Sequence, residues 1–365
     1  MSEWQTFCLK DLGKIVGGAT PSTNNPKNYG NKIAWITPKD LSTLQGRYIK
    51  KGSRSISRLG FKSCSCVLLP KHAILFSSRA PIGYVAIAKK RLCTNQGFKS
   101  IIPNKKIYFE FLYYLLKYHK DNISNIGGGT TFKEVSGATL GLFKVKIPPT
   151  YYEQQKIART LSILDQKIEN NHKINELLHT LAYKIYEYYF KYKPKNAKLE
   201  QIIIENPKSS IMVKNAQKTQ DKYPFFTSGD NILFYPKAII DGRNCFLNTG
   251  GNAGIKFYVG KASYSTDTWC ICANEFSDYL YLLLSSIKTH INQSFFQGTS
   301  LKHLQKNLLK KYPIYMPSAH EIKKFNQIIM PLLTLISINT RTSKKLEQIR
   351  DFLLPLLLTQ QVKPQ

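Results

Sequence analysis

The chain has 365 residues, which is too long for one ordinary hydrophobic core and is typical of two or three domains. Its hydrophobic content of 42% and aromatic content of 12% exclude an intrinsically disordered protein. The formal net charge is +31, because 53 lysines and arginines face only 22 acidic residues, and a coding bias toward lysine would have raised glutamate too. The imbalance favours a polyanionic partner, first of all nucleic acid, over a merely soluble basic surface.

The N-terminus and the apolar runs predict an intracellular, cytoplasmic protein. Residues 1–10 lack the apolar run of a secretory signal, and the apolar run at 352–358 is far shorter than the roughly 20 residues of a membrane span. Seven cysteines are an odd number, as expected for reduced thiols. The C-x-C pairs beginning at Cys64 and Cys270 lack zinc-site spacing, so no metal is predicted and these thiols are interpreted as buried structural residues.

The segment 1–149 reads as a mixed α/β domain. Thr37 before Pro38 marks a helix start, and residues 50–58 are basic and predicted to be exposed. A glycine turn at 127–133 comes shortly before Pro148. Strands are predicted at 33–36, 67–69, 73–76 and 84–88, and an aromatic-rich helix at 109–117.

A long helix is predicted from Thr150 to Phe190. It opens with a capping box, Thr150 and Glu153, which can satisfy the first free backbone N–H groups. Behind the box, apolar residues recur at alternating spacings of three and four, the seam of a coiled coil that needs a partner helix. The seam is Leu161, Leu164, Ile168, Asn171, Asn175, Leu178, Ala182, Ile185 and Tyr189.

The partner helix lies in the same chain. A second capping box, Ser318 and Glu321, stands at an offset of 321 − 153 = 168 from the first, and the same offset places Asn339 opposite Asn171 in the pattern. Polar residues in an apolar seam fix the register, so the two helices are expected to pack together. Pro331 and Pro355 are each expected to kink or end the second helix. Its seam is Ile329, Leu332, Ile336, Asn339, Ser343, Leu346, Arg350, Leu353 and Leu357.

Residues 194–317 repeat the plan of the first domain with a drifted sequence. Several segments of the first domain that have the character of a strand, turn or helix find a counterpart in the same order. The chain is therefore globule, helix, globule, helix. The matched segments are 246–254 with 76–83, 264–269 with 93–98, 279–287 with 109–117, and 297–302 with 128–133.

This doubled order resembles the specificity subunits of type I restriction-modification systems over essentially the full length. The resemblance is carried by Trp-Ile-Thr-Pro-Lys-Asp-Leu at 35–41, the Gly-Thr-Thr and Gly-Thr-Ser turns, and the two Pro-x-x-x-Glu helix openings. It implies an α+β fold in which two mixed α/β target-recognition domains are separated by two long antiparallel, coiled-coil-like helices in a pseudo-twofold repeat. The implied bounds are 1–149 and 194–317 for the domains, and 150–193 and 318–365 for the helices.

The resemblance also implies a role. Such a chain would bind double-stranded DNA at a bipartite, asymmetric site and would dock two methyltransferase subunits and the restriction subunits that act as motor and nuclease. S-adenosylmethionine, ATP and Mg would then belong to those partners. A helix of about 38 residues spans roughly 57 Å, which is enough to hold two domains about one turn of DNA, roughly 34 Å, apart.

Catalytic motifs are not found in the sequence. Residues 127–131 lack the lysine that a phosphate-binding loop needs, and Ile147 stands where an adenine methyltransferase motif requires an amide or a carboxylate. The glycine-rich segment 250–254 is interpreted as a connection between strands. The chain is therefore predicted not to be an enzyme. A self-sufficient methyltransferase or nuclease, and a basic nucleic-acid-binding protein without sequence preference, remain the alternatives.

Loop cations are the candidates for DNA contact, because lysine and arginine position phosphates and arginine can also read base edges. An exposed cation is equally ordinary on any protein surface. The candidates are Arg47, Arg54, Arg58, Arg79, Lys99, Lys214, Lys218, Arg243, Lys256 and Lys302.

Overall fold

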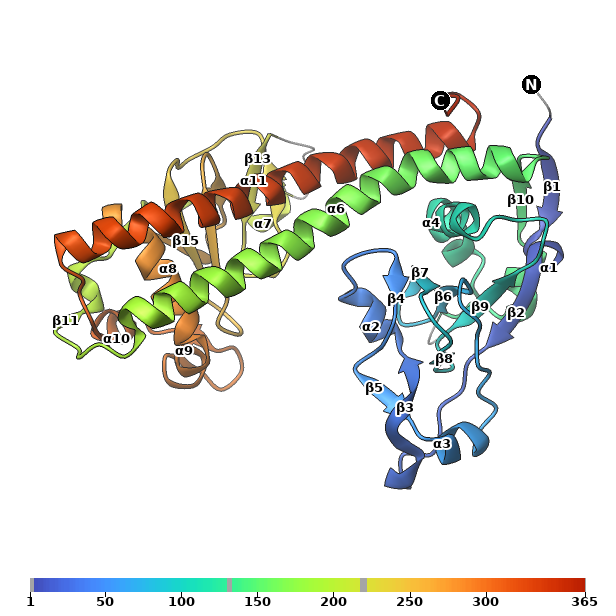
Figure 1. Cartoon of the computed structure of the whole chain (residues 1–365), viewed down its shortest axis with the longest axis horizontal. Helices are drawn as coiled ribbons and strands as arrows, with labels where there is room; N and C mark the ends of the chain where they lie inside the picture. The colour runs from blue at the N-terminus through green and yellow to red at the C-terminus, as the bar shows by residue number, and fades with distance from the viewer. Residues whose placement is uncertain (1–2, 130–132, 217–221, 365) are drawn as a thin grey trace. The chain divides into compact units, whose positions relative to one another are not determined.

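Figure 1 shows the computed structural model of the chain, which describes residues 3–129, 133–216 and 222–364. The chain divides into two compact units. The first comprises residues 1–170 and 344–365, and the second comprises residues 171–343. The division falls inside both long helices, so each unit holds one α/β body and one stretch of each helix.

The first body is built from three small sheets. A five-stranded sheet has the order β2-β9-β6-β7-β4, a three-stranded sheet has the order β5-β3-β8, and β1 pairs with β10. The strands are β1 (Gln5–Cys8), β2 (Gly13–Gly17), β3 (Tyr29–Ile36), β4 (Tyr48–Ile49), β5 (Arg54–Ile56), β6 (Ile74–Ser78), β7 (Ile82–Ala88), β8 (Cys93–Thr94), β9 (Lys99–Pro103) and β10 (Lys144–Ile147). The helices are α1 (Leu9–Leu12), η1 (Pro26–Asn28), α2 (Pro38–Ser42), α3 (Arg58–Lys62), α4 (Phe109–Asn125) and α5 (Gly137–Leu142).

Most sequence-predicted elements of the first body are confirmed. The segments 33–36, 73–76 and 84–88 lie in β3, β6 and β7, apart from Ala73, which directly precedes β6, and the aromatic-rich helix is α4. Thr37 caps α2 as predicted, because the Asp40 carboxylate accepts hydrogen bonds from both its backbone N–H and its hydroxyl. The segment 67–69 is not a strand and contributes only an isolated bridge between Leu69 and Leu92.

The core of the first body extends onto both long helices. Phe76 of β6 and Phe111 of α4 are fully buried, and they belong to one apolar cluster with Leu161 of the first long helix and Leu357 of the second. Because burial of such side chains is the main favourable term in folding, the body is fastened to the helix pair by its own core.

The second body repeats the first in strand order. The antiparallel hairpin β15–β16 with β18 beside it corresponds to β6–β7 with β9, and the parallel pair β13–β17 corresponds to β3–β8. The strands are β11 (Ala197–Lys198), β12 (Ile204–Glu205), β13 (Tyr223–Phe226), β14 (Leu233–Tyr235), β15 (Arg243–Asn248), β16 (Ile255–Val259), β17 (Ser263–Tyr264), β18 (Thr268–Cys272), β19 (Phe296–Gln297), β20 (His303–Leu304) and β21 (Pro313–Ile314). The helices are η3 (Leu199–Gln201), α7 (Val213–Ala216), η4 (Asn274–Phe276), α8 (Ser277–Ser286), α9 (Lys288–Ser294) and α10 (Lys306–Lys310). The internal repeat predicted from sequence is thus confirmed.

The two long helices are α6 (Tyr151–Tyr186), continued by the π-helical turn η2 (Glu187–Lys191), and α11 (Ala319–Leu358). Both start at their predicted capping boxes: Glu153 N–H donates to Thr150, and Ser318 and Glu321 bond reciprocally. Neither Pro331 nor Pro355 ends α11, so of the two expected effects of a proline only a kink stays a prediction.

The helices pack antiparallel, as Figure 1 shows for α6 and α11. In the second unit Asn171 donates to Ser343 and Asn339 donates to Asn175, so residue numbers rise along one helix as they fall along the other. Most of the other predicted seam positions are buried or partly buried. They are Leu161, Leu164, Ile168, Leu178, Ile185, Ile329, Leu332, Ile336, Leu346 and Leu353.

Two adjacent isoleucines of α11 test this packing. Ile329 is fully buried in the core of the second unit, whereas Ile328 is 42% exposed. Ile329→Ala should lower the free energy of unfolding by about 2–5 kcal/mol through lost burial and a residual cavity, while Ile328→Ala should change it by less than about 0.5 kcal/mol. Urea unfolding followed by circular dichroism measures both. Equal effects of the two substitutions would contradict the assignment of Ile329 to the packed face of α11.

Candidate nucleic-acid interface

One strongly basic part of the first body is the segment Pro26–Lys62, called here the basic lobe, which has nine lysines and arginines and one acid. It comprises η1, β3, α2, β4, β5 and α3, several of which are labelled together in Figure 1. Eight of its cations are exposed, and none forms an ion pair with a described residue. They are Lys27, Lys32, Lys39, Lys50, Lys51, Arg54, Arg58 and Lys62.

Two apolar clusters hold the basic lobe, and both also contain residues from the rest of the first body. Trp35 and Ile56, from the paired strands β3 and β5, are buried in one apolar cluster, and the Trp35 indole N–H donates to the Ala19 carbonyl. At the start of α3, Ser57 accepts from the Gly60 N–H and donates to the Lys27 carbonyl. These contacts fix the backbone that carries the exposed lysines and arginines.

Asp40 is the only acidic residue of the lobe, and its carboxylate is used internally. It accepts the Thr37 N–H at 2.8 Å and the Ser53 N–H at 2.7 Å, and so ties the loop after β4 to the start of α2. Burial alone would raise the pKa of Asp40, but these hydrogen bonds outweigh it and lower the pKa. Gly52 allows this approach, since a Cβ there would lie 2.7 Å from the Asp40 carboxylate.

The lobe belongs to a longer acid-poor stretch. Between Asp11 and Glu110 the chain has eighteen lysines and arginines but one acid, Asp40. This stretch contains no recognisable motif, and its sequence signal is the near absence of acidic residues. Lys27, Lys32 and Lys62 are therefore candidates that the motif-based prediction missed.

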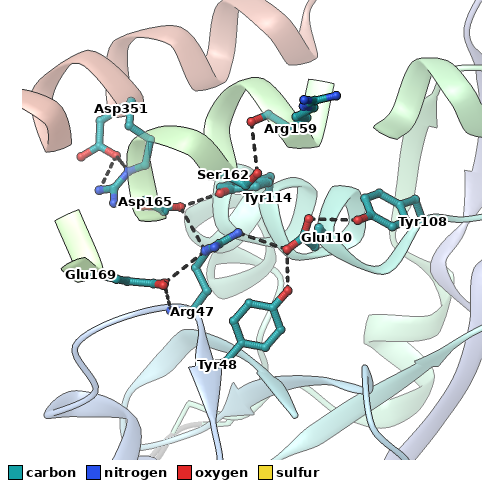
Figure 2. Close-up of polar contacts among 11 residues, drawn as sticks. Arg47, Tyr48, Tyr108, Glu110, Tyr114, Arg159, Ser162, Asp165, Glu169 and Asp351 are labelled. Atoms are coloured by element: carbon teal, nitrogen blue, oxygen red, sulfur yellow. Dashed lines mark hydrogen bonds and ion pairs between the residues drawn. The ribbon is translucent and has the colours of Figure 1, made fainter. Parts of the chain in front are cut away.

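Of the predicted DNA contacts in the first body, Arg54 and Arg58 are exposed, as expected. The prediction for Arg47 is corrected, because only 4% of its side chain is exposed and it pairs with Glu110 and Glu169 (Figure 2). A buried guanidinium that is already held by carboxylates cannot bind a phosphate.

Arg79 and Lys99 share a single carboxylate. Both lie within 3.3 Å of Glu134, with side chains 38% and 20% exposed. One acid cannot neutralise two cations, so this corner keeps a net positive charge. Arg79 and Glu134 also line one surface pocket with Lys133.

The predicted DNA contacts in the second body also include both exposed cations and cations that are bonded within the protein. Lys214 and Lys302 are exposed, whereas Lys218 lies outside the described residues. Lys256 donates to the Thr227 carbonyl and the Asn248 side chain, and burial lowers its pKa. The prediction that Arg243 contacts DNA is also corrected, because its side chain forms a bidentate pair with the buried carboxylate of Asp278.

Other candidate sites of the sequence have structural places. The glycine-rich segment 250–254 connects β15 to β16, as predicted. The described residues contain no group of three or more His, Cys, Asp or Glu side chains that could hold a metal ion. Over the same residues, no helix combines the length and apolarity needed to cross a membrane.

Comparison with known proteins decides the family. The family model for the type I restriction modification DNA specificity domain matches residues 1–180 and again residues 195–348, one match for each repeat. The chain belongs to this family. It is a DNA specificity subunit of a type I restriction-modification system, as its fold and basic character had indicated.

Individual relatives agree. The subunit is 33% identical over 403 aligned residues to the type I restriction enzyme MjaIX specificity subunit of Methanocaldococcus jannaschii, covering 98% of this chain and 93% of that protein. It is 30% identical over 177 residues to the HindI specificity subunit of Haemophilus influenzae, covering 46% and 37%. The crystal structure of a type I S subunit from M. genitalium matches with a TM-score of 0.63 at 18% identity, covering 97% and 96% of the two chains, which shows a shared fold.

The basic lobe can be tested through salt. Arg54→Gln with Arg58→Gln should weaken duplex binding and reduce the slope of log affinity against log salt by about two, roughly one for each phosphate that is no longer bound. Fluorescence anisotropy at 50–200 mM salt measures the slope. The control is Lys323→Gln with Lys324→Gln, two exposed lysines of α11. A slope that falls no more than in the control would remove the lobe from the DNA interface.

Proposed function

We propose that this specificity subunit reads a bipartite, asymmetric duplex sequence, one half with each body. The observation that supports this best is the repeat itself: the two bodies share a strand order, while their loops and charges differ. A shared plan gives the same mode of docking, and unlike surfaces give unlike base preferences. The site should therefore have two different halves.

The helix pair is proposed to set the gap between the halves. With 36 residues in α6 and 40 in α11, the helices would span roughly 54 and 60 Å at 1.5 Å per residue. Either length exceeds one turn of duplex, roughly 34 Å. A pair of helices with a bonded polar seam resists sliding, so the gap would have one preferred length.

The subunit is further proposed to supply only the recognition of the DNA sequence, while partner subunits catalyse the reactions. Methyltransferase subunits with S-adenosylmethionine, and restriction subunits with ATP and Mg, would dock on it. Several large apolar side chains of the long helices are more than 40% exposed, as expected for surfaces that partners cover. They are Ile163, Ile174, Leu177 and Leu181 on α6, and Ile328, Leu335, Ile338, Ile349 and Phe352 on α11.

Replacing one body tests the two-part reading. A chain in which residues 194–317 come from another specificity subunit should keep one half-site and change the other. Mapping of methylated adenines in cells carrying each version, with the partner subunits, reads both halves at once. If both halves changed, the assignment of one body to each half would be refuted.

Lengthening the helix pair tests the spacer. One heptad inserted into each helix adds about 10 Å, or about three base pairs, and keeps the seam on the same face because seven residues make nearly two turns. The same methylation map should show unchanged half-sites and a gap longer by about three base pairs. An unchanged gap would contradict the spacer role.

A further inference from the structure

Two arginines, Arg47 buried and Arg243 partly buried, join the two bodies to the long helices. In the first unit, the Arg47 side chain donates to Glu110 on α4 at 3.1 Å and to Glu169 on α6 at 3.2 Å (Figure 2). Its backbone N–H also donates to Glu169 at 2.9 Å. One residue therefore joins the sheet, the first turn of α4 and the long helix.

The surroundings of Arg47 are shaped for this contact. Gly46 has φ +128°, and a Cβ there would lie 3.2 Å from Glu169, so glycine lets the loop approach the helix. Nearby, Asp165 of α6 accepts from Tyr114 of α4 at 2.5 Å and from Arg350 of α11 at 2.7 Å. The network thus reaches both long helices within the first unit.

The second unit holds a matching contact. Arg243 forms a bidentate pair with Asp278 at the first turn of α8, and it donates to the Thr334 hydroxyl and the Met330 carbonyl of α11. The Val259 N–H donates to the Ser337 hydroxyl at 3.0 Å. As in the first unit, an arginine and a backbone N–H of the body meet the long helix together.

The acceptors repeat, but the arginines do not. Asp278 lies in the first turn of α8 as Glu110 lies in the first turn of α4. Ser337 of α11 corresponds to Glu169 of α6, since 337 − 169 = 168, the offset that relates the two capping boxes. Arg47 directly precedes β4, whereas Arg243 begins β15, and these strands are not counterparts. The two bodies therefore make similar contacts to the long helices with arginines that come from non-equivalent strands.

We propose that Arg47 and Arg243 are positioning residues, which hold each body in one orientation on its helix and thereby restrict the gap between half-sites that the subunit accepts. A planar guanidinium held by two or more acceptors fixes orientation better than apolar packing does. Buried ion pairs add little net stability, so a gain in orientation is a physical reason to retain them. This inference rests on the proposed two-part reading.

The test is selection of DNA from a random duplex library by the full-length chain and its variants. Arg47→Lys and Arg243→Lys keep the charge but lose the fork. Should the lysine variants fail to fold, Thr334→Val with Ser337→Ala removes two hydrogen bonds to α11 and leaves the Arg243–Asp278 ion pair in place. Arg159→Lys, at an exposed position of α6, is the matched control.

The variants should select the same two half-sites as the unaltered chain, with affinity for gaps one base pair too long or short rising about tenfold relative to the preferred gap, the size of a typical mismatch effect. Folded variants with an unchanged gap preference would overturn the positioning role, and so would altered base preferences at an unchanged gap. If the unaltered chain selected no two-part sequence, the proposed function would fail, and this inference with it.

Discussion

The hydrogen bonds between Asn171 and Ser343 and between Asn339 and Asn175 align the two long helices where they pack in the second unit. The offset between the capping boxes converts one bond into the other, so together they mark the pseudo-twofold relation of the two halves. A shift of either helix by one turn would leave the buried Asn171 amide without its partner, at a cost of about 1–3 kcal/mol. The seam therefore selects one register among several that apolar packing alone would permit.

The contacts that hold each body on the long helices are similar in the two bodies, whereas the exposed loops differ. The positions that hold each body repeat: Glu110 and Asp278 each lie in the first turn of a helix of their body, and Glu169 and Ser337 correspond on the long helices. The exposed loops do not repeat: the first body carries the basic lobe, whereas the glycine-rich connection 250–254 lies in the second. A protein built this way can change what it reads without changing how its bodies are mounted.

Local signals predicted much of this fold. The capping boxes, the seam, the cap at Thr37 and the repeated order follow from short-range patterns, and the structure contains them. The fates of Arg47 and Arg243 could not be predicted in that way, because Arg47 and Glu169 are far apart in the sequence and only the folded chain joins them. That α11 continues through both of its prolines also could not be predicted from local signals. An interior proline costs about 3 kcal/mol, but burial of Ile329, Leu333 and Leu357 on either side offsets it.

The isolation of Asp40 among eighteen cations has a kinetic consequence. Its carboxylate is turned inward to Thr37 and Ser53, so no other carboxylate within the basic lobe opposes the positive field of the lobe. Such a field reaches about 8 Å into solution at physiological salt and accelerates encounter with a polyanion. The cationic half would capture a duplex of any sequence first and hold it loosely while it slides. Base contacts made by both bodies would then decide where the sliding stops.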